Sequence, residues 1–235
     1  MKIMLDAGHG YNTAGKRTVD GTMREWEFNS KVAHYVNEAL KGYENVSTKY
    51  AHDTTGKTDV SLTTRTNNAN SWKADVYVSI HANANGNGKW DSASGIETYV
   101  YTSKPKEALA LANKVQDELV KVTSRKNRGV KTADFHVLRE THMTAILCEC
   151  GFMTNKEEAA LLKSDSYRKK VANAIVSGLA KQYGLKKKTV TKMEDKAVNN
   201  TLYKVQVGAF SVKSNADKLA EELKKKGYSV VVTQN

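Results

Sequence analysis

Short apolar runs alternate with longer segments of helical periodicity through most of the chain. The short runs are rich in β-branched residues and predict strands, whereas the longer segments repeat apolar residues every three or four positions. Strands that alternate with helices favour a largely parallel sheet. We therefore predict an α/β fold with a mostly parallel sheet flanked by helices on both faces. The predicted strands are 2–5, 46–51, 75–80, 96–101 and 145–149, and the predicted helices are 22–40, 61–72, 106–122 and 166–183.

The pattern divides the 235 residues into one domain of ordinary size, a linker and a small C-terminal unit. Residues 1–184 form the domain, in which the polar stretch 125–133 is expected to be a loop. Residues 185–200 are charged, poor in apolar side chains and without periodicity, which is typical of a linker. The remaining residues, 201–235, predict one βαβ unit, with strands at 202–210 and 228–233 around a helix at 214–226.

The chain is strongly basic, with 37 Lys and Arg against 25 Asp and Glu and a formal charge of +12. Such a charge attracts polyanions, which include nucleic acids, anionic lipids and acidic wall polymers. The sequence contains no groove-reading helix motif and no RNA-binding aromatic signature, so we expect no nucleic-acid partner. No apolar run approaches the length of 18 residues that a membrane span needs, so we expect no membrane span.

The N-terminus and the two cysteines indicate synthesis in a reducing compartment. The segment Met1–Asp6 is too short and too quickly acidic for a secretory signal, so we expect a protein made in the cytoplasm. Cys148 and Cys150 are poor disulfide partners at this spacing, and free thiols agree with such a compartment. They are either small buried hydrophobic residues, which we favour, or metal ligands.

Four polar residues lie where predicted strands end or a predicted helix begins. His9 lies between two glycines after the first strand, Glu25 opens a helix, His81 follows a buried strand, and Glu149 ends the last strand. Zinc hydrolases use three ligands from His and carboxylates, and a separate carboxylate takes a proton from the metal-bound water. We therefore predict a Zn²⁺ site with His9, Glu25 and His81 as ligands and Glu149 as the general base.

Each of these residues also has a simpler interpretation. His9 can be an exposed loop residue, and His81 and Glu149 can each be a strand end that emerges into solvent. Glu25 fits a capping box that starts at Thr22, which taken alone is the better explanation, and Glu27 is the neighbouring alternative ligand.

Taken together, the motifs resemble a known family, the zinc-dependent N-acetylmuramoyl-L-alanine amidases of the type 3 class. These are peptidoglycan hydrolases of bacteria and phages. The matching pieces, in the family's order, are Asp6-Ala7-Gly8-His9-Gly10, Glu25-Trp26-Glu27-Phe28-Asn29, Ser61-Leu62 with Arg65 and Ala69-Asn70, Ser79-Ile80-His81-Ala82-Asn83, Gly95-Ile96-Glu97 and Glu149-Cys150-Gly151-Phe152-Met153-Thr154-Asn155. The chain departs from the family at Ala7 and Thr144, where proline is common.

The resemblance implies an activity and roles for the site residues. It implies zinc bound by His9, Glu25 and His81, with Glu149 as the catalytic carboxylate, and it selects Glu25 over Glu27. The reaction implied is cleavage of the amide between the lactyl group of muramic acid and the L-alanine of the stem peptide in peptidoglycan. The alternatives are a non-catalytic wall-binding protein of the same fold and a zinc carboxypeptidase that acts on the same polymer.

The C-terminal unit, residues 201–235, resembles one sporulation-related (SPOR-like) repeat, a wall-binding module that normally holds two repeats. One repeat leaves a helix face and a sheet edge uncovered, so we expect two chains to pair these residues in a homodimer. The alternative is a module that is truncated inside the domain. The lack of a recognisable secretory signal at the N-terminus suggests action on the cell wall after release by lysis, either as a phage endolysin or as a mother-cell autolysin.

Overall fold

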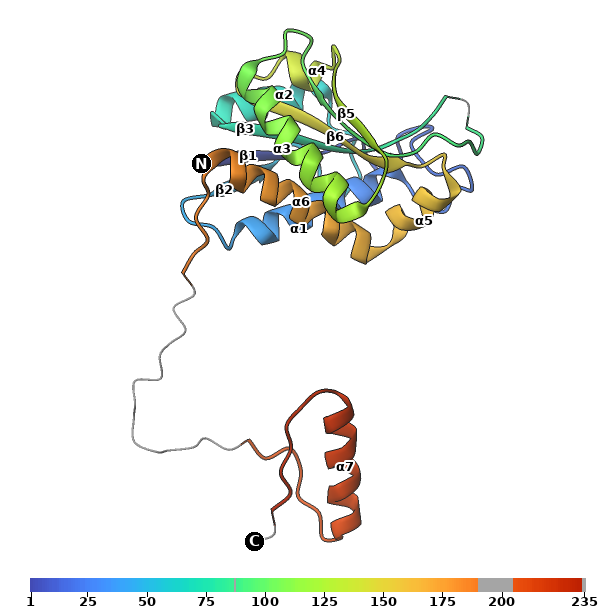
Figure 1. Ribbon diagram of the computed structural model, residues 1–235, viewed down its shortest axis with the longest axis vertical. Helices are drawn as coiled ribbons and strands as arrows, with labels where there is room; N and C mark the ends of the chain where they lie inside the picture. Colours follow the sequence, from blue (N-terminus) through green and yellow to red (C-terminus); the bar gives the residue numbers. More distant parts are fainter. Residues whose placement is uncertain (87, 190–204, 234–235) are drawn as a thin grey trace. The chain divides into compact units, whose positions relative to one another are not determined.

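The computed structural model describes residues 1–86, 88–189 and 205–233, which belong to two compact units (Figure 1). The first unit is Met1–Thr189 and the second is Val190–Asn235. No described helix is long and apolar enough to cross a lipid bilayer. The strands are β1 (Lys2–Ala7), β2 (Ser47–Tyr50), β3 (Val76–Asn83), β4 (Ile96–Val100), β5 (Asn127–Thr132) and β6 (Thr144–Phe152). The helices are α1 (Glu25–Leu40), α2 (Leu62–Trp72), α3 (Lys106–Thr123), α4 (His136–Arg139), α5 (Lys156–Lys163), α6 (Asp165–Tyr183) and α7 (Lys213–Lys225).

The first unit is built on one six-stranded sheet in the order β2-β1-β3-β6-β4-β5. All neighbouring strands are parallel except β4 and β6, which are antiparallel. The predicted α/β fold with a mostly parallel sheet is therefore confirmed. Because β4 and β5 run in the opposite direction, their first residues lie at the same edge as the last residues of β1, β3 and β6.

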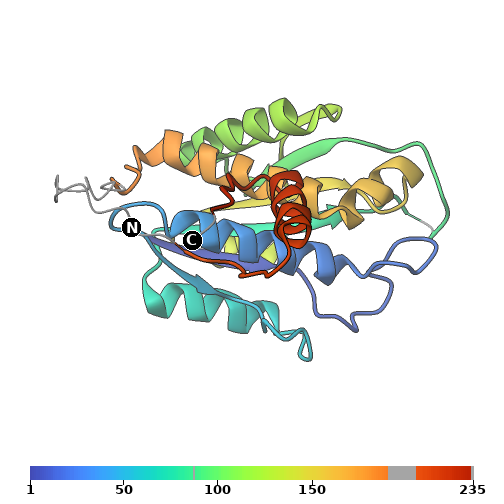
Figure 2. The ribbon, with the colours of Figure 1, turned by 90° about the horizontal axis from the view of Figure 1, so that it is seen from below.

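Helices cover the two faces of the sheet unequally. α1, α6 and α3 lie side by side over one face, where apolar side chains from every other residue of β1 and β3 are buried (Figure 2). The opposite face carries a smaller core, formed with α2 and α4 around Tyr77 and Leu147. This smaller core leaves polar side chains near the carboxyl ends of β1, β3 and β6 open to a pocket.

The predicted loop at 125–133 is wrong, because residues Asn127–Thr132 form the edge strand β5. β5 pairs only with β4, and none of its residues is fully buried. An edge strand that is open to solvent does not need the apolar pattern by which buried strands are found in a sequence.

The second unit contains α7, which confirms the helix predicted at 214–226. The described residues beside it, 205–212 and 226–233, form no strand, in contrast to the two predicted strands. Two short segments without further strands to pair with are marginal as a sheet. Residues 190–204, which include most of the predicted linker and the start of the first predicted strand, lie outside the described residues.

Candidate metal centre

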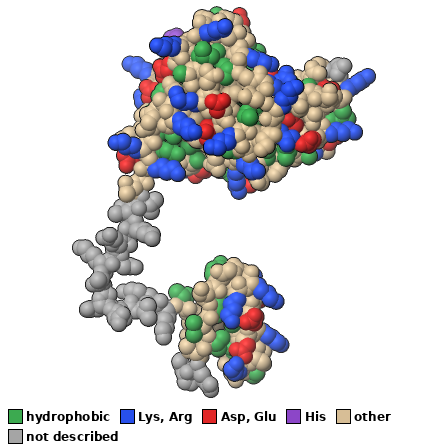
Figure 3. Space-filling model, in the orientation of Figure 1, with side chains coloured by type: hydrophobic (Ala, Val, Ile, Leu, Met, Phe, Trp, Pro, Cys, Tyr) green, Lys and Arg blue, Asp and Glu red, His purple; other side chains and the backbone are tan. Residues whose placement is uncertain are grey.

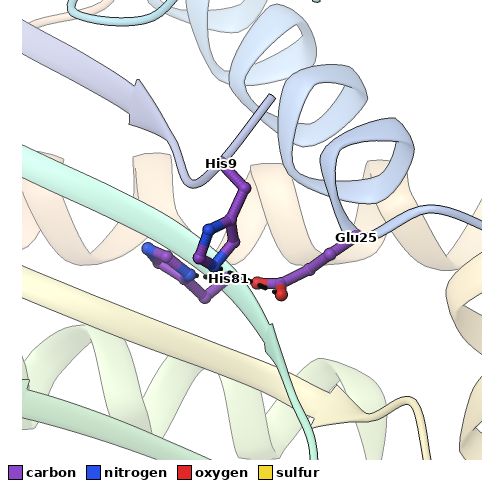
Figure 4. A group of neighbouring side chains, drawn as sticks. All are labelled: His9, Glu25 and His81. Carbon is purple, nitrogen blue, oxygen red and sulfur yellow. Dashed lines mark hydrogen bonds and ion pairs between the residues drawn. The ribbon is translucent and has the colours of Figure 1, made fainter. Parts of the chain in front are cut away.

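His9 lies in the loop after β1 and adopts a left-handed backbone conformation. Its φ angle is +66°, which is uncommon for a residue with a side chain. Arg65 of α2 holds this loop, because Nη2 donates to the carbonyl oxygen of His9 at 3.1 Å and Nη1 donates to that of Ala7 at 2.7 Å. The loop is thus fixed from inside the domain, and the imidazole of His9 points toward His81 and the carboxylate of Glu25 (Figure 4).

Glu25 is the first residue of α1, and its carboxylate points at both histidines (Figure 4). The capping role belongs to Glu27, whose Oε2 accepts a hydrogen bond from the backbone N–H of Arg24 at 2.6 Å. The capping box predicted for Thr22 and Glu25 is therefore wrong, and Glu25 is free to face the histidines. Its Oε1 accepts from Nδ2 of Asn29 and from the backbone N–H of Ala82, both at 3.2 Å.

His81 lies on β3 directly beneath the loop that carries His9. A Cβ atom at Gly8 would lie 2.0 Å from Cε1 of the His81 ring, so only glycine lets the loop cross the imidazole. The N–H of Gly8 donates to the carbonyl oxygen of Ile80 at 3.0 Å, which fixes this crossing to β3.

The structure brings His9, Glu25 and His81 together. One ligand atom from each of the three lies within 4.8 Å of the others. Nε2 of His9 is 3.4 Å from Oε2 of Glu25, and Nδ1 of His81 is 3.0 Å from Oε1. Two donors that share a tetrahedral zinc ion lie about 3.3 Å apart, and two imidazoles with one carboxylate are a common zinc ligand set. The residues present therefore fit a zinc ion.

The pKa values of the three residues shift in different directions. Burial lowers the pKa of His9 to about 4, against the charge of Glu25, so the imidazole is neutral and able to bind a metal. Burial opposes the charged form of Glu25, but the hydrogen bond and charge of His81 dominate and lower its pKa. Burial opposes the charged form of His81, but its hydrogen bond to Glu25 and the charge of that carboxylate dominate and raise its pKa, so a divalent cation that binds here displaces a proton from this imidazole.

Glu149 lies on β6 as the register partner of His81 on β3. Its Oε2 is buried and has no hydrogen-bond partner among the described residues. Burial raises the pKa of Glu149 to about 8, and the carboxylates of Glu25 and Glu97 contribute to the rise. A carboxyl with a raised pKa beside a metal-ligand set is suited to proton transfer near neutral pH.

Glu149 and the two histidines line the same pocket, which has a volume of about 500 Å³. Cys148 and Cys150 lie in the hydrophobic core instead, as we favoured from the sequence. Both thiols are fully buried, and burial raises their pKa values, which opposes a role as metal ligands.

A buried ion pair beneath the site was not predicted. Asp6 and Arg65 are each 1% exposed, and Nη1 of Arg65 is 2.5 Å from Oδ1 of Asp6. Ser79 donates to the other carboxylate oxygen of Asp6 at 2.9 Å. Arg65 thus neutralises Asp6 and fixes the His9 loop at once. In the sequence, Arg65 was singled out only as part of the family motifs.

Replacing Arg65 with Leu is expected to lower the free energy of unfolding by roughly 3–5 kcal/mol, because it leaves Asp6 buried without its partner. Urea unfolding of the metal-free protein measures this effect. Arg17→Leu is the control, since Arg17 is exposed and forms none of the described salt bridges. A loss for Arg65→Leu no larger than that of the control would contradict the structural role of the pair.

Comparison with known proteins agrees with this geometry. A family model described as N-acetylmuramoyl-L-alanine amidase matches residues 3–181. The chain belongs to the N-acetylmuramoyl-L-alanine amidase family. A second family model, the SPOR domain, matches residues 199–235 of this amidase.

Two curated relatives span nearly the whole chain. The N-acetylmuramoyl-L-alanine amidase CwlM of Bacillus licheniformis is 38% identical over 99% of this chain and 84% of its own length. The sporulation-specific N-acetylmuramoyl-L-alanine amidase of Bacillus subtilis (strain 168) is 36% identical with the same coverage. Among solved structures, the catalytic domain of CwlV, an N-acetylmuramoyl-L-alanine amidase from Bacillus (Paenibacillus) polymyxa var. colistinus, superposes with a TM-score of 0.72. The two chains are 31% identical, and the match covers 79% of this chain and 99% of the CwlV chain.

Proposed function

We propose that this enzyme is a zinc-dependent peptidoglycan hydrolase that cleaves the amide between N-acetylmuramic acid and the L-alanine of the stem peptide. The observation that supports it most is the convergence of His9, Glu25 and His81 beside the buried carboxyl of Glu149. The identity of the cleaved bond is inferred from membership of the amidase family.

In this proposal His9, Glu25 and His81 hold the zinc ion. When bound, zinc lowers the pKa of a water molecule to roughly 7 and polarises the carbonyl of the scissile amide. Glu149 accepts the proton of the attacking water and passes it to the nitrogen of L-alanine as that amine leaves. Asn29 keeps the carboxylate of Glu25 in place through its hydrogen bond to Oε1.

Product analysis tests this proposal against its alternatives. Purified cell wall is incubated with the protein, with and without a chelator, and the new chemical ends are identified. Free L-alanine amines without new reducing sugars indicate an amidase, and their loss with chelator indicates the metal. Free D-alanine would instead indicate a carboxypeptidase, and no release at all would indicate a wall-binding protein without activity.

For the C-terminal unit we propose that two chains pair through residues 201–235 to form one wall-binding module. Apolar side chains are at the surface of the described part of this unit, including Val205 at 87%, Val207 at 63% and Val231 at 84% exposure (Figure 3). A second copy of the same unit offers matching apolar surface and further segments with which the predicted strands could pair. The route to the wall, by release through lysis, stays a prediction.

Light scattering at micromolar concentration tests the pairing. The full chain is expected to be a dimer, and the compact unit 1–189 alone is expected to be a monomer. A full-length chain that stays monomeric would contradict the pairing.

A further inference from the structure

The loop that carries His9 begins with a buried main-chain N–H group that needs an acceptor. This group belongs to Ala7, the last residue of β1, which is fully buried. The pairing of β1 with β2 ends at Leu5, whose carbonyl oxygen accepts the N–H of Ala51 at 2.9 Å. Main-chain groups of alternate residues in a strand point to the same side, so the N–H of Ala7 points to the β2 side, beyond the last paired residue. A buried N–H without a partner there would be costly.

A side chain accepts this hydrogen bond in place of a strand. Nδ1 of His52 accepts the N–H of Ala7 at 3.0 Å. His52 is 7% exposed, and its ring packs against that of Tyr50, with the ring centroids 5.0 Å apart. Because Nδ1 accepts a hydrogen bond, the proton of the neutral ring is on Nε2. Burial lowers the pKa of His52 to about 4, against the charge of Asp6, so the ring is neutral at neutral pH.

The segment that carries His52 also holds the other end of the His9 loop. This segment, residues 52–59, lies between β2 and α2, and we call it the clamp segment. The carbonyl oxygen of Gly56 accepts the N–H of Tyr11 at 3.0 Å. The clamp segment is therefore bonded to the chain two residues before His9 and two residues after it.

His9 needs such support because its backbone conformation is unfavourable. Its φ of +66° lies in the left-handed region, which is costly for a residue with a side chain and persists only where the surrounding structure fixes it. Arg65 donates to the carbonyl oxygens of Ala7 and His9, whereas His52 accepts the N–H of Ala7. Loss of the imidazole would leave this N–H unpaired, so the start of the loop would no longer be fixed on the β2 side.

We propose that His52 is a positioning residue for the metal centre. By accepting the N–H of Ala7, it fixes the point at which the chain leaves β1. The imidazole of His9 is thereby held where it faces Glu25 and His81. His52 is not one of the three residues that could hold the ion, so its effect on metal binding is indirect. This inference rests on the proposed function, because it assigns a support to the zinc site of that function.

The zinc affinities of two variants of the full-length chain test this role. His52→Leu fills much of the space of the imidazole but has no acceptor, whereas His52→Asn presents Oδ1 at the place of Nδ1. The leucine variant is expected to bind zinc about 10–100-fold more weakly than the wild type, and the asparagine variant less than about 3-fold more weakly, because only the former loses the hydrogen bond that orients a ligand. Competition with a chromophoric chelator measures the affinity, and circular dichroism verifies that each variant is folded.

Nitrogen-15 NMR of the imidazoles in the metal-free wild type gives a second readout. His52 is expected to have a protonated Nε2 and an unprotonated Nδ1, and the amide of Ala7 is expected to exchange slowly with solvent. A proton on Nδ1 would overturn the inference. If His52→Leu does not fold, His52→Gln replaces it, since its acceptor lies one bond further from the backbone, at the place of Nε2.

His34→Leu is the matched control, because His34 is exposed on α1 and its imidazole forms none of the described hydrogen bonds. Its zinc affinity is expected to equal that of the wild type. Equal losses in His52→Leu and His52→Asn would overturn the inference, because ring packing and not the hydrogen bond would then be responsible. Wild-type affinity in both would also overturn it. A wild type that binds no zinc would contradict the proposed function instead, which separates the two ideas.

Discussion

Replacing Glu149 with Gln is expected to lower kcat by about 10²–10⁴-fold while zinc stays bound, because the amide cannot accept the proton of the attacking water. The change is nearly isosteric, and Glu149 is not one of the three residues that could hold the metal. Measurement of amine release together with zinc content per chain distinguishes a lost base from a lost metal. A variant that keeps near-full activity would show that the base is a different residue.

The same substitution is expected to stabilise the metal-free protein at high pH, although it lowers kcat. Burial raises the pKa of Glu149 from 4.5 to about 8 in the folded state. Between these two values the folded protein holds a proton that the unfolded chain has released, so the free energy of unfolding falls as pH rises. Gln carries no charge, so Glu149→Gln is expected to be more stable than the wild type at pH 9, by up to about 5 kcal/mol, and similar at pH 4. Urea unfolding with chelator present measures the difference, and equal stability at pH 9 would contradict the buried carboxylate.

Replacing His81 with Ala is expected to reduce zinc affinity by more than 100-fold and to abolish activity at one equivalent of zinc. Even residues that only orient a metal ligand contribute about 10–100-fold in affinity, so the loss of one of three ligands should exceed this. Competition with a chromophoric chelator measures the affinity. In the wild type, zinc is expected to raise the melting temperature, since it binds only the folded site.

His142→Ala is the matched control, because His142 is exposed and its imidazole forms none of the described hydrogen bonds; only its backbone N–H donates, to Oδ1 of Asn70, and the substitution keeps that group. Its zinc affinity and activity are expected to equal those of the wild type. Wild-type zinc affinity in His81→Ala would mean that the ion binds elsewhere, and the zinc site proposed here would then be wrong.

The central strands and the two histidines near their carboxyl ends were predictable because they depend on the local sequence pattern. β1, β3 and β6 are buried on both faces and therefore appear in the sequence as apolar runs, and polar residues directly after such runs lie at one edge of a parallel sheet. His9 and His81 could be placed together by this reasoning alone. The family resemblance was needed for Glu25, because the first turn of a helix offers several carboxylates with similar local patterns.

The supporting residues could not be predicted in the same way. Arg65 interacts with Asp6 and Glu97 with Arg128, and both pairs are distant in the sequence and become neighbours only through the folded sheet. β5 has no apolar pattern because it is an edge strand, and its bulge depends on pairing with β4. The helix predicted from residue 22 begins at Glu25, because Glu25 and Glu27 both fit the capping position in the sequence. Contacts of Glu25 with the histidines leave Glu27 as the capping residue.

The order of the strands has a consequence for how such enzymes can diversify. The three residues that would hold zinc come from the first 83 residues, whereas β4, α3 and β5 form one continuous segment from Ile96 to Thr132 on the other flank of β6. β4, α3 and β5 therefore lie in the chain between β3 and β6, although β3 and β6 pair directly in the sheet. Exchanging residues 96–132 between homologues would therefore change one flank of the sheet while the β3–β6 pair that sets His81 beside Glu149 stays as it was.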